Sequence, residues 1–423
     1  MVEFSLPRGL RDVPPEEAIA AEAVRAAFLD TCNLFDYKLM EPSTLELIET
    51  LEAKSGPSIR NEIYYFKDKS GRDLGLRFDL TVGITRFVTG RRDLSPPVRL
   101  GCYSSMWRYE EPQYGRYRWF YQWDAELFGP SNAEADAEII EFSASLFNKL
   151  GTRPLISIGS RRIIESFIRK KLGIEDKKKI LGTLRAVDKI SKKSLDGIAK
   201  EYSEIISADD LRAVAEFAKT KGDADRFSNE LKNYGIDANP LLEILDSVKA
   251  RGVENAEINL SIVRGIDYYT DMVFEAFDLD NLNLGSLCGG GRYDSLPTIY
   301  GRPDLGATGV AGGVERALLA YKLSRPGEKK VFVAPVGKNP NLIRAAASIA
   351  ANLRRAGIPA QSEVIEKSLR KILEAQSDVG TKAVIIVGER ELSEDSVKIK
   401  WMESGEEKTV SLDKLESELA SKL

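Results

Sequence analysis

The chain contains no histidine among its 423 residues. This absence excludes the Ser-His-Asp and Cys-His nucleophile systems, the most common general base of enzymes, and every histidine-ligated metal site. Any chemistry that the chain performs must therefore depend on arginines, carboxylates, tyrosines and backbone groups.

Cysteines and long apolar runs are also scarce. The three cysteines, Cys32, Cys102 and Cys288, form no CxxC pair, which disfavours a zinc site or a redox motif and fits a reducing cytoplasm. No window approaches the roughly 18 consecutive apolar residues of a membrane span, and the N-terminus lacks the pattern of a secretory signal. We therefore expect a cytoplasmic protein with no membrane partner.

The charge of the chain limits the partners that it can bind, and its length limits the number of domains that it can form. A net charge of −4 excludes a uniformly basic molecule, so any contact with nucleic acid must use local patches. The composition is 43% hydrophobic and 30% charged, as in ordinary globular proteins. A chain of 423 residues is long for one compact core, which predicts two or three domains.

The first part of the chain mixes helix and strand patterns. We expect a helix at residues 16–32, strands at 63–68 and 74–80, a helix at 81–90, two long antiparallel strands between 98 and 129, and a strand at 155–159. Ser131 and Glu134 have the spacing of a capping box at the start of a further helix.

The remaining patterns predict three domains in an α+β chain. Residues 161–255 are rich in lysine, glutamate and leucine without a strand pattern, which predicts a helical insertion. Strand patterns return at 258–263 and 272–277, and residues 306–320 resemble a strand that runs into a helix. After a linker signal at 324–330, a β-α-β-α-β pattern predicts a separate α/β domain. The predicted domains are 1–160 with 256–323, the insertion 161–255, and 330–423.

Residues 108–129 carry the densest set of chemical groups. On the second strand of the predicted hairpin, Phe120, Gln122, Asp124 and Glu126 share one face, since side chains alternate. Arg116 and Arg118 continue this face towards the loop. Such an array can present arginines and an aromatic ring to an anion attached to a flat base. The alternative is an exposed hairpin with cross-strand salt bridges. The glycine-rich residues 285–296 are equally open to two interpretations, a flexible turn or a close approach to a ligand.

Four motifs, in order along the chain, resemble those of one family. R-x-E at 108–110 followed by F-x-Q-x-x-x-E at 120–126 resembles motif 2 of class II aminoacyl-tRNA synthetases, and GATGVAGGVERALLA at 306–320 resembles motif 3. VRGIDYYTDMVFEAF at 263–277 and CGGGRYDSL at 288–296 resemble the two signatures of histidyl-tRNA synthetases. The resemblance implies a catalytic domain built on a six- or seven-stranded antiparallel sheet, with an anticodon-binding α/β domain at 330–423.

Two other readings share parts of this resemblance. A catalytically inactive relative regulates the first enzyme of histidine biosynthesis, but it usually lacks the C-terminal domain and tends to lose the signature residues, whereas Arg108, Arg264 and Arg316 are present here. A class II synthetase for another amino acid would keep motifs 2 and 3 without RGIDYYT.

The resemblance implies ATP as a substrate, accompanied by Mg²⁺ whose protein ligands it does not identify. Arg108 corresponds to the residue that holds the α-phosphate, and Arg316 and Arg116 to residues near the other phosphates. Adenine is expected between Phe120 and Arg316, with Glu110 near its edge. Arg264 corresponds to the arginine that bridges the amino-acid carboxylate and the α-phosphate; the alternative is a strand arginine paired with Asp267.

The resemblance also implies a histidine pocket and a nucleic-acid substrate. The pocket residues include those that hold the α-ammonium and those that select the imidazole: Asp79, Thr81, Gln122, Glu126, Arg264, Tyr268, Tyr269 and Tyr293. For each tyrosine, core packing is the alternative. The tRNA(His) acceptor end is expected near Gln113. The basic run at 169–193 either binds phosphates of the tRNA or is a solvated helix face. Residues near 16–42 should form a homodimer interface.

Overall fold

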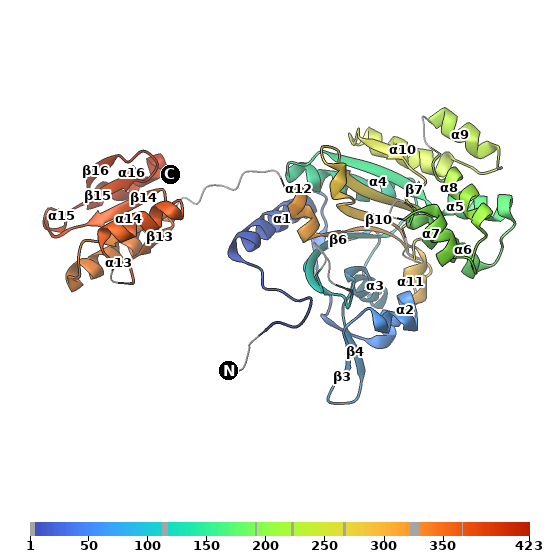
Figure 1. Cartoon of the computed structure of the whole chain (residues 1–423), viewed down its shortest axis with the longest axis horizontal. Coiled ribbons are helices and arrows are strands. Elements are labelled where there is room, and N and C mark those ends of the chain that lie inside the picture. Colours follow the sequence, from blue (N-terminus) through green and yellow to red (C-terminus); the bar gives the residue numbers. More distant parts are fainter. Residues whose placement is uncertain are drawn as a thin grey trace. The chain divides into compact units, whose positions relative to one another are not determined.

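The computed structural model describes residues 5–111, 117–190, 193–220, 224–264, 268–321, 330–365 and 367–423. The chain divides into two compact units, Met1–Leu323 and Ser324–Leu423 (Figure 1). The predicted linker at 324–330 lies almost wholly outside the described residues. Each unit is described by itself.

An eight-stranded sheet organises the described part of the first unit. Its order is β1-β5-β6-β11-β10-β9-β7-β8, and the six strands from β5 to β7 are antiparallel. The strands are β1 (Lys38–Leu39), β5 (Val98–Trp107), β6 (Trp119–Gly129), β7 (Pro154–Ser160), β8 (Ala256–Ile258), β9 (Met272–Asp278), β10 (Cys288–Arg292) and β11 (Gly306–Gly313). These six strands agree with the expected antiparallel sheet of six or seven strands. The sheet has one further short strand at each edge, since β1 and β8 pair in parallel with β5 and β7.

Helices cover both faces of this sheet because its strands alternate between two apolar sides. Trp123, Ala125 and Leu127 of β6 belong to one apolar cluster with α1 (Pro15–Leu34), α4 (Ala133–Lys149) and α12 (Val314–Ala320). Phe128, on the other face, packs in a cluster with α3 (Leu80–Gly90) and α11 (Ser295–Ile299). The even-numbered residues of β6 therefore face the α3 side.

The cap of α4 differs from the prediction. Asn132, not Ser131, is the N-cap, and its side chain accepts from the backbone N–H of Ala135 at 3.0 Å. Ser131 instead donates to Asp294 Oδ2 at 3.1 Å. Glu134 forms an ion pair with Arg251, so the predicted capping box does not form.

Two predicted strands end earlier than expected because a polar side chain redirects the backbone. Strand β4 (Asp73–Leu76) stops short of residue 80, since Asp79 becomes the N-cap of α3. The strand predicted at 258–263 ends at Ile258. The Asn259 side chain accepts from the backbone N–H and the hydroxyl of Ser261, which forms a turn.

A small sheet and a group of helices complete the first unit. The sheet has the order β2-β4-β3, with β2 (Leu45–Leu47) and β3 (Tyr65–Lys67), and lies beside α2 (Ile48–Ser55) and η1 (Pro57–Asn61). A short η2 (Leu282–Leu284) follows β9. Between β7 and β8 the described residues form α5 (Arg161–Leu172), α6 (Lys177–Asp188), α7 (Leu195–Glu201), α8 (Ala208–Phe217), α9 (Ala224–Lys232) and α10 (Asn239–Ala250).

The second unit is a three-layer α/β fold. Strands β12 (Val331–Pro335), β13 (Ala360–Ser362) and β14 (Ala383–Val387) are parallel, and β15 (Ser396–Trp401) and β16 (Glu407–Ser411) extend the sheet antiparallel in the order β13-β12-β14-β15-β16. Helix α13 (Pro340–Arg355) packs on one face with η3 (Leu412–Lys414) and α16 (Leu415–Lys422), and α14 (Leu369–Asp378) packs on the other. The short α15 (Glu389–Ser393) precedes β15.

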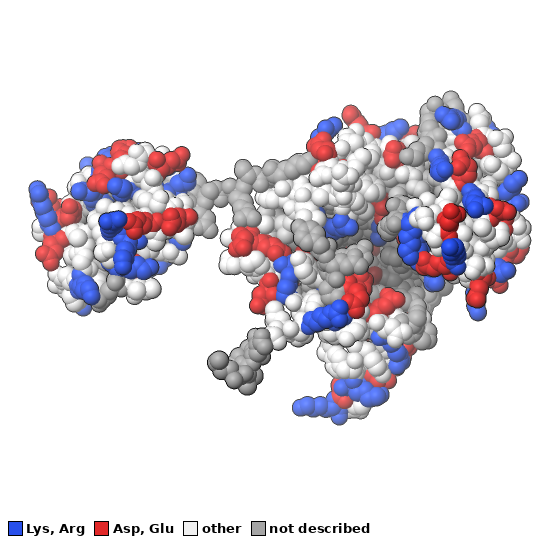
Figure 2. Space-filling view, viewed as in Figure 1, with Lys and Arg blue, Asp and Glu red and all other residues white. Residues whose placement is uncertain are grey.

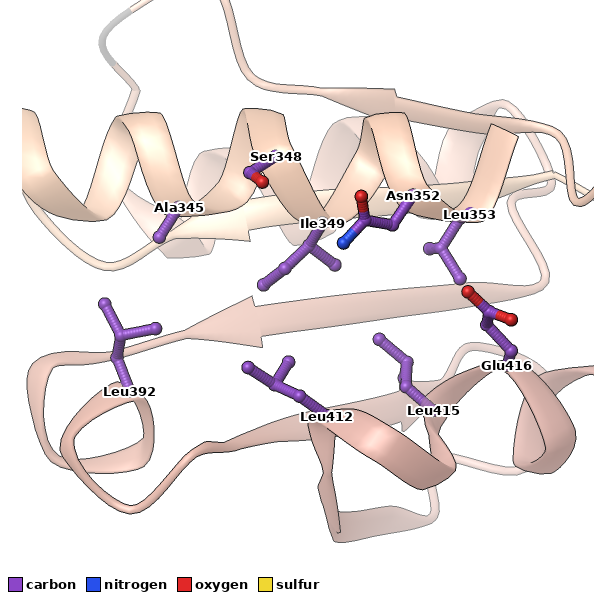
Figure 3. Close-up of a pocket in the computed structure, with 9 residues that line it drawn as sticks. All are labelled: Ala345, Ser348, Ile349, Asn352, Leu353, Leu392, Leu412, Leu415 and Glu416. Carbon is purple, nitrogen blue, oxygen red and sulfur yellow. The ribbon is translucent and has the colours of Figure 1, made fainter. Parts of the chain in front are cut away.

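The second unit also contains a pocket of about 200 Å³ (Figure 3). It lies between α13 and the segments α15, η3 and α16, and leucines from all four elements line it. None of the predicted catalytic or substrate-binding residues belongs to it.

Within the described residues, no helix is long and apolar enough to cross a membrane. Charged side chains of both signs are interspersed over α5–α8 on the face shown in Figure 2. Several cations of the basic run are engaged within the protein: Arg169 pairs with Glu165, and Lys193 with Glu201.

Candidate active site

The polar face of β6 is enclosed by the protein rather than exposed on a hairpin. β6 pairs with β5 on one side and β11 on the other, and it lies near the middle of the sheet. Gln122, Asp124 and Glu126 are all buried, Asp124 at 0% exposure. Burying three polar side chains without hydrogen-bond partners would cost free energy. The hydrogen bonds that they make therefore indicate what each side chain does.

Hydrogen bonds connect this face to the start of α3. Gln122 Nε2 donates to Asp124 Oδ1 at 2.8 Å, and Thr81 Oγ1 donates to Asp124 Oδ2 at 3.4 Å. Asp79 caps α3 by accepting from the backbone N–H of Val82 at 3.1 Å. The structure therefore brings together Thr81 and Gln122, and places Asp79 two residues from Thr81.

Three tyrosines form the apolar wall beside Glu126. The rings of Tyr268 and Tyr269 lie 4.7 Å apart, and those of Tyr268 and Tyr293 lie 5.7 Å apart in an edge-to-face arrangement. All three are buried in the cluster that includes α3. The Tyr293 hydroxyl also donates to Glu126 Oε2. Packing and a polar contact are therefore combined at Tyr293.

The surroundings of Glu126 disfavour the ionised form of its carboxyl group. Burial, followed by the nearby charge of Asp124, raises its pKa well above the ordinary value. Gly309 lies directly opposite Glu126 on β11, and a Cβ there would come 1.5 Å from Oε2. A glycine at this position is thus required for the observed position of the carboxyl group.

Arg264, in the segment after β8, lies beside Tyr269 of the tyrosine wall. Its backbone has a φ of +49°, in the left-handed region that non-glycine residues rarely adopt. Its Nη1 donates to Glu275 Oε1 at 3.1 Å, and its Cζ lies 5.9 Å from the centre of the Tyr269 ring. The buried Nε has no hydrogen-bond partner among the described residues. Asp267, the pairing partner considered from sequence, lies outside them.

Burial acts to lower the pKa of Arg264, but Tyr269 and Glu275 outweigh this effect and the pKa lies above its ordinary value. Arg264 therefore carries a permanent positive charge beside the tyrosine wall.

Two of the arginines predicted to bind ATP, Arg108 and Arg316, donate to backbone carbonyl groups. Arg108, directly after β5, donates from Nε to the Phe78 carbonyl at 3.0 Å, and its guanidinium lies 5.1 Å from the centre of the Phe120 ring. Arg316, on α12, donates from Nη1 to the Leu284 carbonyl at 2.6 Å. Glu110 is exposed at the end of the hairpin. Gln113 and Arg116 lie outside the described residues.

Arg118 continues the polar face of β6 in sequence, yet its side chain stabilises the chain locally. Its Nε donates to the Glu110 carbonyl at 2.9 Å and its Nη1 to the Arg8 carbonyl at 3.2 Å. Its guanidinium also lies 4.1 Å from the centre of the Tyr109 ring.

Three residues at this site had no role assigned from sequence. Asp124 is the acceptor that joins Gln122 to Thr81, Glu275 pairs with Arg264, and Gly289 makes space for Arg264. The alternation on β6 already placed Asp124 on the polar face. Glu275 and Gly289 lie opposite each other only because β9 pairs with β10, so their shared contact with Arg264 could not be predicted from the sequence.

Metal-ligating side chains are not gathered at this site. Among the described residues, no group of three or more cysteine, aspartate or glutamate side chains could hold a metal ion. The three cysteines are buried as free thiols.

Two sequence models of known families match the chain. The model described as Histidyl-tRNA synthetase matches residues 9–317, and the model described as Anticodon binding domain matches residues 330–422. The histidine–tRNA ligase of Pyrobaculum islandicum is 35% identical over 410 residues, covering 95% of this chain and 94% of that protein. The histidine–tRNA ligase of Pyrococcus furiosus is 34% identical over 423 residues, covering 96% of each.

Solved structures are similar in fold. The crystal structure of histidyl-tRNA synthetase from Nostoc sp. PCC 7120 superimposes with a TM-score of 0.81 at 22% identity, covering 100% of both chains. A structure from Bacillus halodurans, described as an ATP phosphoribosyltransferase regulatory subunit/histidyl-tRNA synthetase, gives a TM-score of 0.74 at 22% identity, covering 92% of this chain and 99% of that one. These likenesses confirm the predicted α+β fold class.

Proposed function

Because the chain belongs to the histidyl-tRNA synthetase family and is therefore a histidine–tRNA ligase, we propose that the buried polar face of β6 is its histidine-activation site. The observation that carries this assignment is that Glu126 and Arg264 both lie against one buried group of tyrosines, Glu126 at Tyr293 and Arg264 at Tyr269. The two half-reactions are formation of histidyl-adenylate from histidine and ATP, and transfer of histidine to the 3′ end of tRNA(His).

The first half-reaction suits a protein without histidine. A histidine carboxylate oxygen attacks the α-phosphorus of ATP, the bond to the β-phosphate oxygen breaks, and pyrophosphate leaves. The carboxylate is already ionised at neutral pH, so no general base is required. The protein must instead position the reactants and supply positive charge.

Arg264 and Arg108 are the proposed catalytic residues. A guanidinium can contact the histidine carboxylate and the α-phosphate at once, which an ammonium cannot do with the same geometry. The buried Nε of Arg264 supports this role, because it has no partner among the described residues and a substrate oxygen would satisfy it. The contact of the Arg108 guanidinium with the Phe120 ring supports a nucleotide site that uses both residues.

The remaining ATP contacts extend this proposal. Arg316 and Arg116 bind the outer phosphates, Phe120 and Arg316 enclose adenine, and Glu110 approaches its edge. Magnesium would accompany the polyphosphate and neutralise part of its charge.

The pocket selects histidine through its imidazole. Glu126 accepts from one ring N–H and Tyr269 engages the other nitrogen, while Asp79, Thr81 and Gln122 hold the α-ammonium. An apolar analogue would leave these buried groups unpaired, which penalises it strongly and removes the need for editing. Tyr268 and Tyr293 complete the wall of the pocket.

The partners of the protein are part of the same proposal. Gln113 approaches the acceptor end of the tRNA, and the unit at 330–423 binds the anticodon. A homodimer is supported by large apolar side chains exposed on α1, β1, β2 and β3: Ile19, Leu34, Leu39, Leu45, Leu47, Tyr65 and Phe66. The buried free thiols support a reducing, cytoplasmic location.

ATP–pyrophosphate exchange with each of the twenty amino acids tests the proposed function. We expect exchange with histidine alone. Exchange with a different amino acid would overturn the assignment of the pocket, and a folded protein without any exchange would overturn the catalytic role.

A further inference from the structure

Two residues with no role in the proposed function, Glu275 and Gly289, lie against the Arg264 guanidinium. Glu275 accepts a hydrogen bond from its Nη1 at 3.1 Å. Gly289 is the residue directly opposite Glu275 in the pairing of β9 with β10. Both residues of this cross-strand pair therefore lie next to the guanidinium.

Gly289 is required by the position of the arginine. A Cβ on Gly289 would lie 1.6 Å from Arg264 Nη1 and 3.1 Å from the Phe274 carbonyl oxygen. The first distance is impossible without a shift, while the second is only tight. An alanine would consequently push the flexible end of Arg264 away and leave the strand pairing almost intact.

Glu275 is placed to fix one edge of the guanidinium. The Arg264 and Glu275 side chains are 19% and 24% exposed, so the ion pair is largely shielded from solvent. The backbone of Arg264 is strained, and strained residues persist where their surroundings hold them in place. A carboxylate on Nη1 leaves the buried Nε available for a ligand.

We propose that Glu275 is a positioning residue for histidine activation, which acts only through Arg264, and that Gly289 provides the space in which this contact forms. The inference rests on the proposed role of Arg264. Without the acceptor on Nη1, the guanidinium would sample other orientations, and misplacement of a reacting group by about 1 Å can cost about 100-fold in rate.

The test is single-turnover histidyl-adenylate formation by the full-length protein. Glu275→Ala should lower the rate constant by up to about 100-fold, with a smaller effect on the histidine concentration for half-maximal rate. Glu275→Gln should retain most of the rate, because its amide oxygen still accepts from Nη1. Gly289→Ala should lower the rate as Glu275→Ala does.

The decisive measurement is a double-mutant cycle with Arg264→Ala. If Glu275 acts through Arg264, Glu275→Ala should have no further effect in the Arg264→Ala background, because the group that it positions is gone. Equal effects in both backgrounds would instead identify Glu275 as a structural residue and overturn the proposal. So would a wild-type rate for a folded Glu275→Ala variant.

Glu257→Gln is the matched control. Glu257 is a half-buried carboxylate of the same sheet, on β8, and it accepts from Ser157 Oγ at 2.9 Å. Its substitution should leave the rate unchanged. Failure of wild-type exchange with histidine would refute the proposed function, whereas normal wild-type exchange with an uncoupled Glu275 would refute this inference alone.

Discussion

Arg264 and Glu126 both adopt states in the folded protein that cost free energy. Arg264 has a left-handed backbone conformation, a strain of about 1–3 kcal/mol. Glu126 is fully enclosed next to a second carboxylate. Glycines make room for each side chain, Gly289 for Arg264 and Gly309 for Glu126. A strained arginine and a destabilised carboxyl group on one wall are typical of a site organised for binding and catalysis.

Replacement of Arg264 should affect the first half-reaction most. Arg264→Ala should lower adenylate formation by about 100- to 1,000-fold, since the proposed contact strengthens as charge develops on the phosphate. Arg264→Lys should recover only part of this loss. Single-turnover kinetics of both half-reactions measures the effect, and transfer from preformed adenylate should suffer less. A folded Arg264→Ala variant that forms adenylate at the wild-type rate would show that Arg264 is structural.

Glu126→Gln should change how stability depends on pH. The pKa of Glu126 is raised in the folded state, first by burial and then by Asp124. Its contribution to stability is therefore complete below the unfolded pKa of about 4.3 and is lost as pH rises towards the folded pKa. Wild type should lose stability relative to Glu126→Gln as pH rises above about 4.3. Thermal unfolding of both proteins across this range tests it, and a constant difference in Tm would contradict it.

At the scale of elements, the start of α3 combines a structural and a chemical task. Asp79 caps the helix, and Thr81 in its first turn reaches Asp124 of β6. A helix N-terminus carries partial positive charge, which opposes the binding of an ammonium group. The carboxylates of Asp79 and Asp124 offset this charge and make the end of α3 compatible with the proposed α-ammonium subsite.

Two substitutions of Asp79 separate capping from binding. Asp79→Asn keeps a good N-cap and should leave thermal stability nearly unchanged, while it raises the KM for histidine because the charge is lost. Asp79→Ala should cost about 0.5–2 kcal/mol of stability in addition. Thermal unfolding and histidine-dependent pyrophosphate exchange measure the two effects. An unchanged histidine KM for Asp79→Asn would restrict Asp79 to the cap.

At the scale of the whole molecule, the two compact units each have their own hydrophobic core. The family models also divide the chain between residues 317 and 330. Each unit can therefore be studied as a separate folding unit with its own part in substrate recognition.

Deletion of residues 326–423 should spare the first half-reaction. The proposed activation site lies wholly within the first unit, so histidine-dependent pyrophosphate exchange should persist. Aminoacylation of tRNA should fall much further, because the anticodon contacts are removed. Equal losses of both activities in a folded, truncated protein would contradict this division of labour.

The proposed homodimer should depend on the apolar side chains of α1 and its neighbouring strands. Leu34→Glu, at the C-terminal end of α1, places a charge on a side chain that is 67% exposed, and should weaken association if that side chain is buried in the dimer. Val379→Glu is the control, since Val379 is 61% exposed at the C-terminal end of α14 in the other unit. Sedimentation equilibrium measures the effect, and a monomeric, fully active wild type would contradict the proposal.

The sequence by itself determined the fold class, the long β5–β6 hairpin and the strand that runs into α12. Each of these elements has a strong local pattern. Residues 98–129 are rich in aromatic and β-forming residues, and residues 306–320 are a glycine-rich strand followed by an apolar helix. The motifs identified the family because they keep residue types at fixed spacing, which the chain order alone records.

Only the tertiary structure decided the contacts that depend on strand pairing and on competition between caps. Residues 285–296 suggested a turn or a ligand-binding loop, yet β10 is a central strand whose glycines admit the side chain of Arg264 and the backbone of β9. Asn132 replaced Ser131 as the cap because Asp294, distant in sequence, engages the serine. Glu275 became a partner of Arg264 through a tertiary contact between β9 and the segment after β8. This contact joins residues eleven positions apart in sequence, and no local pattern encodes it.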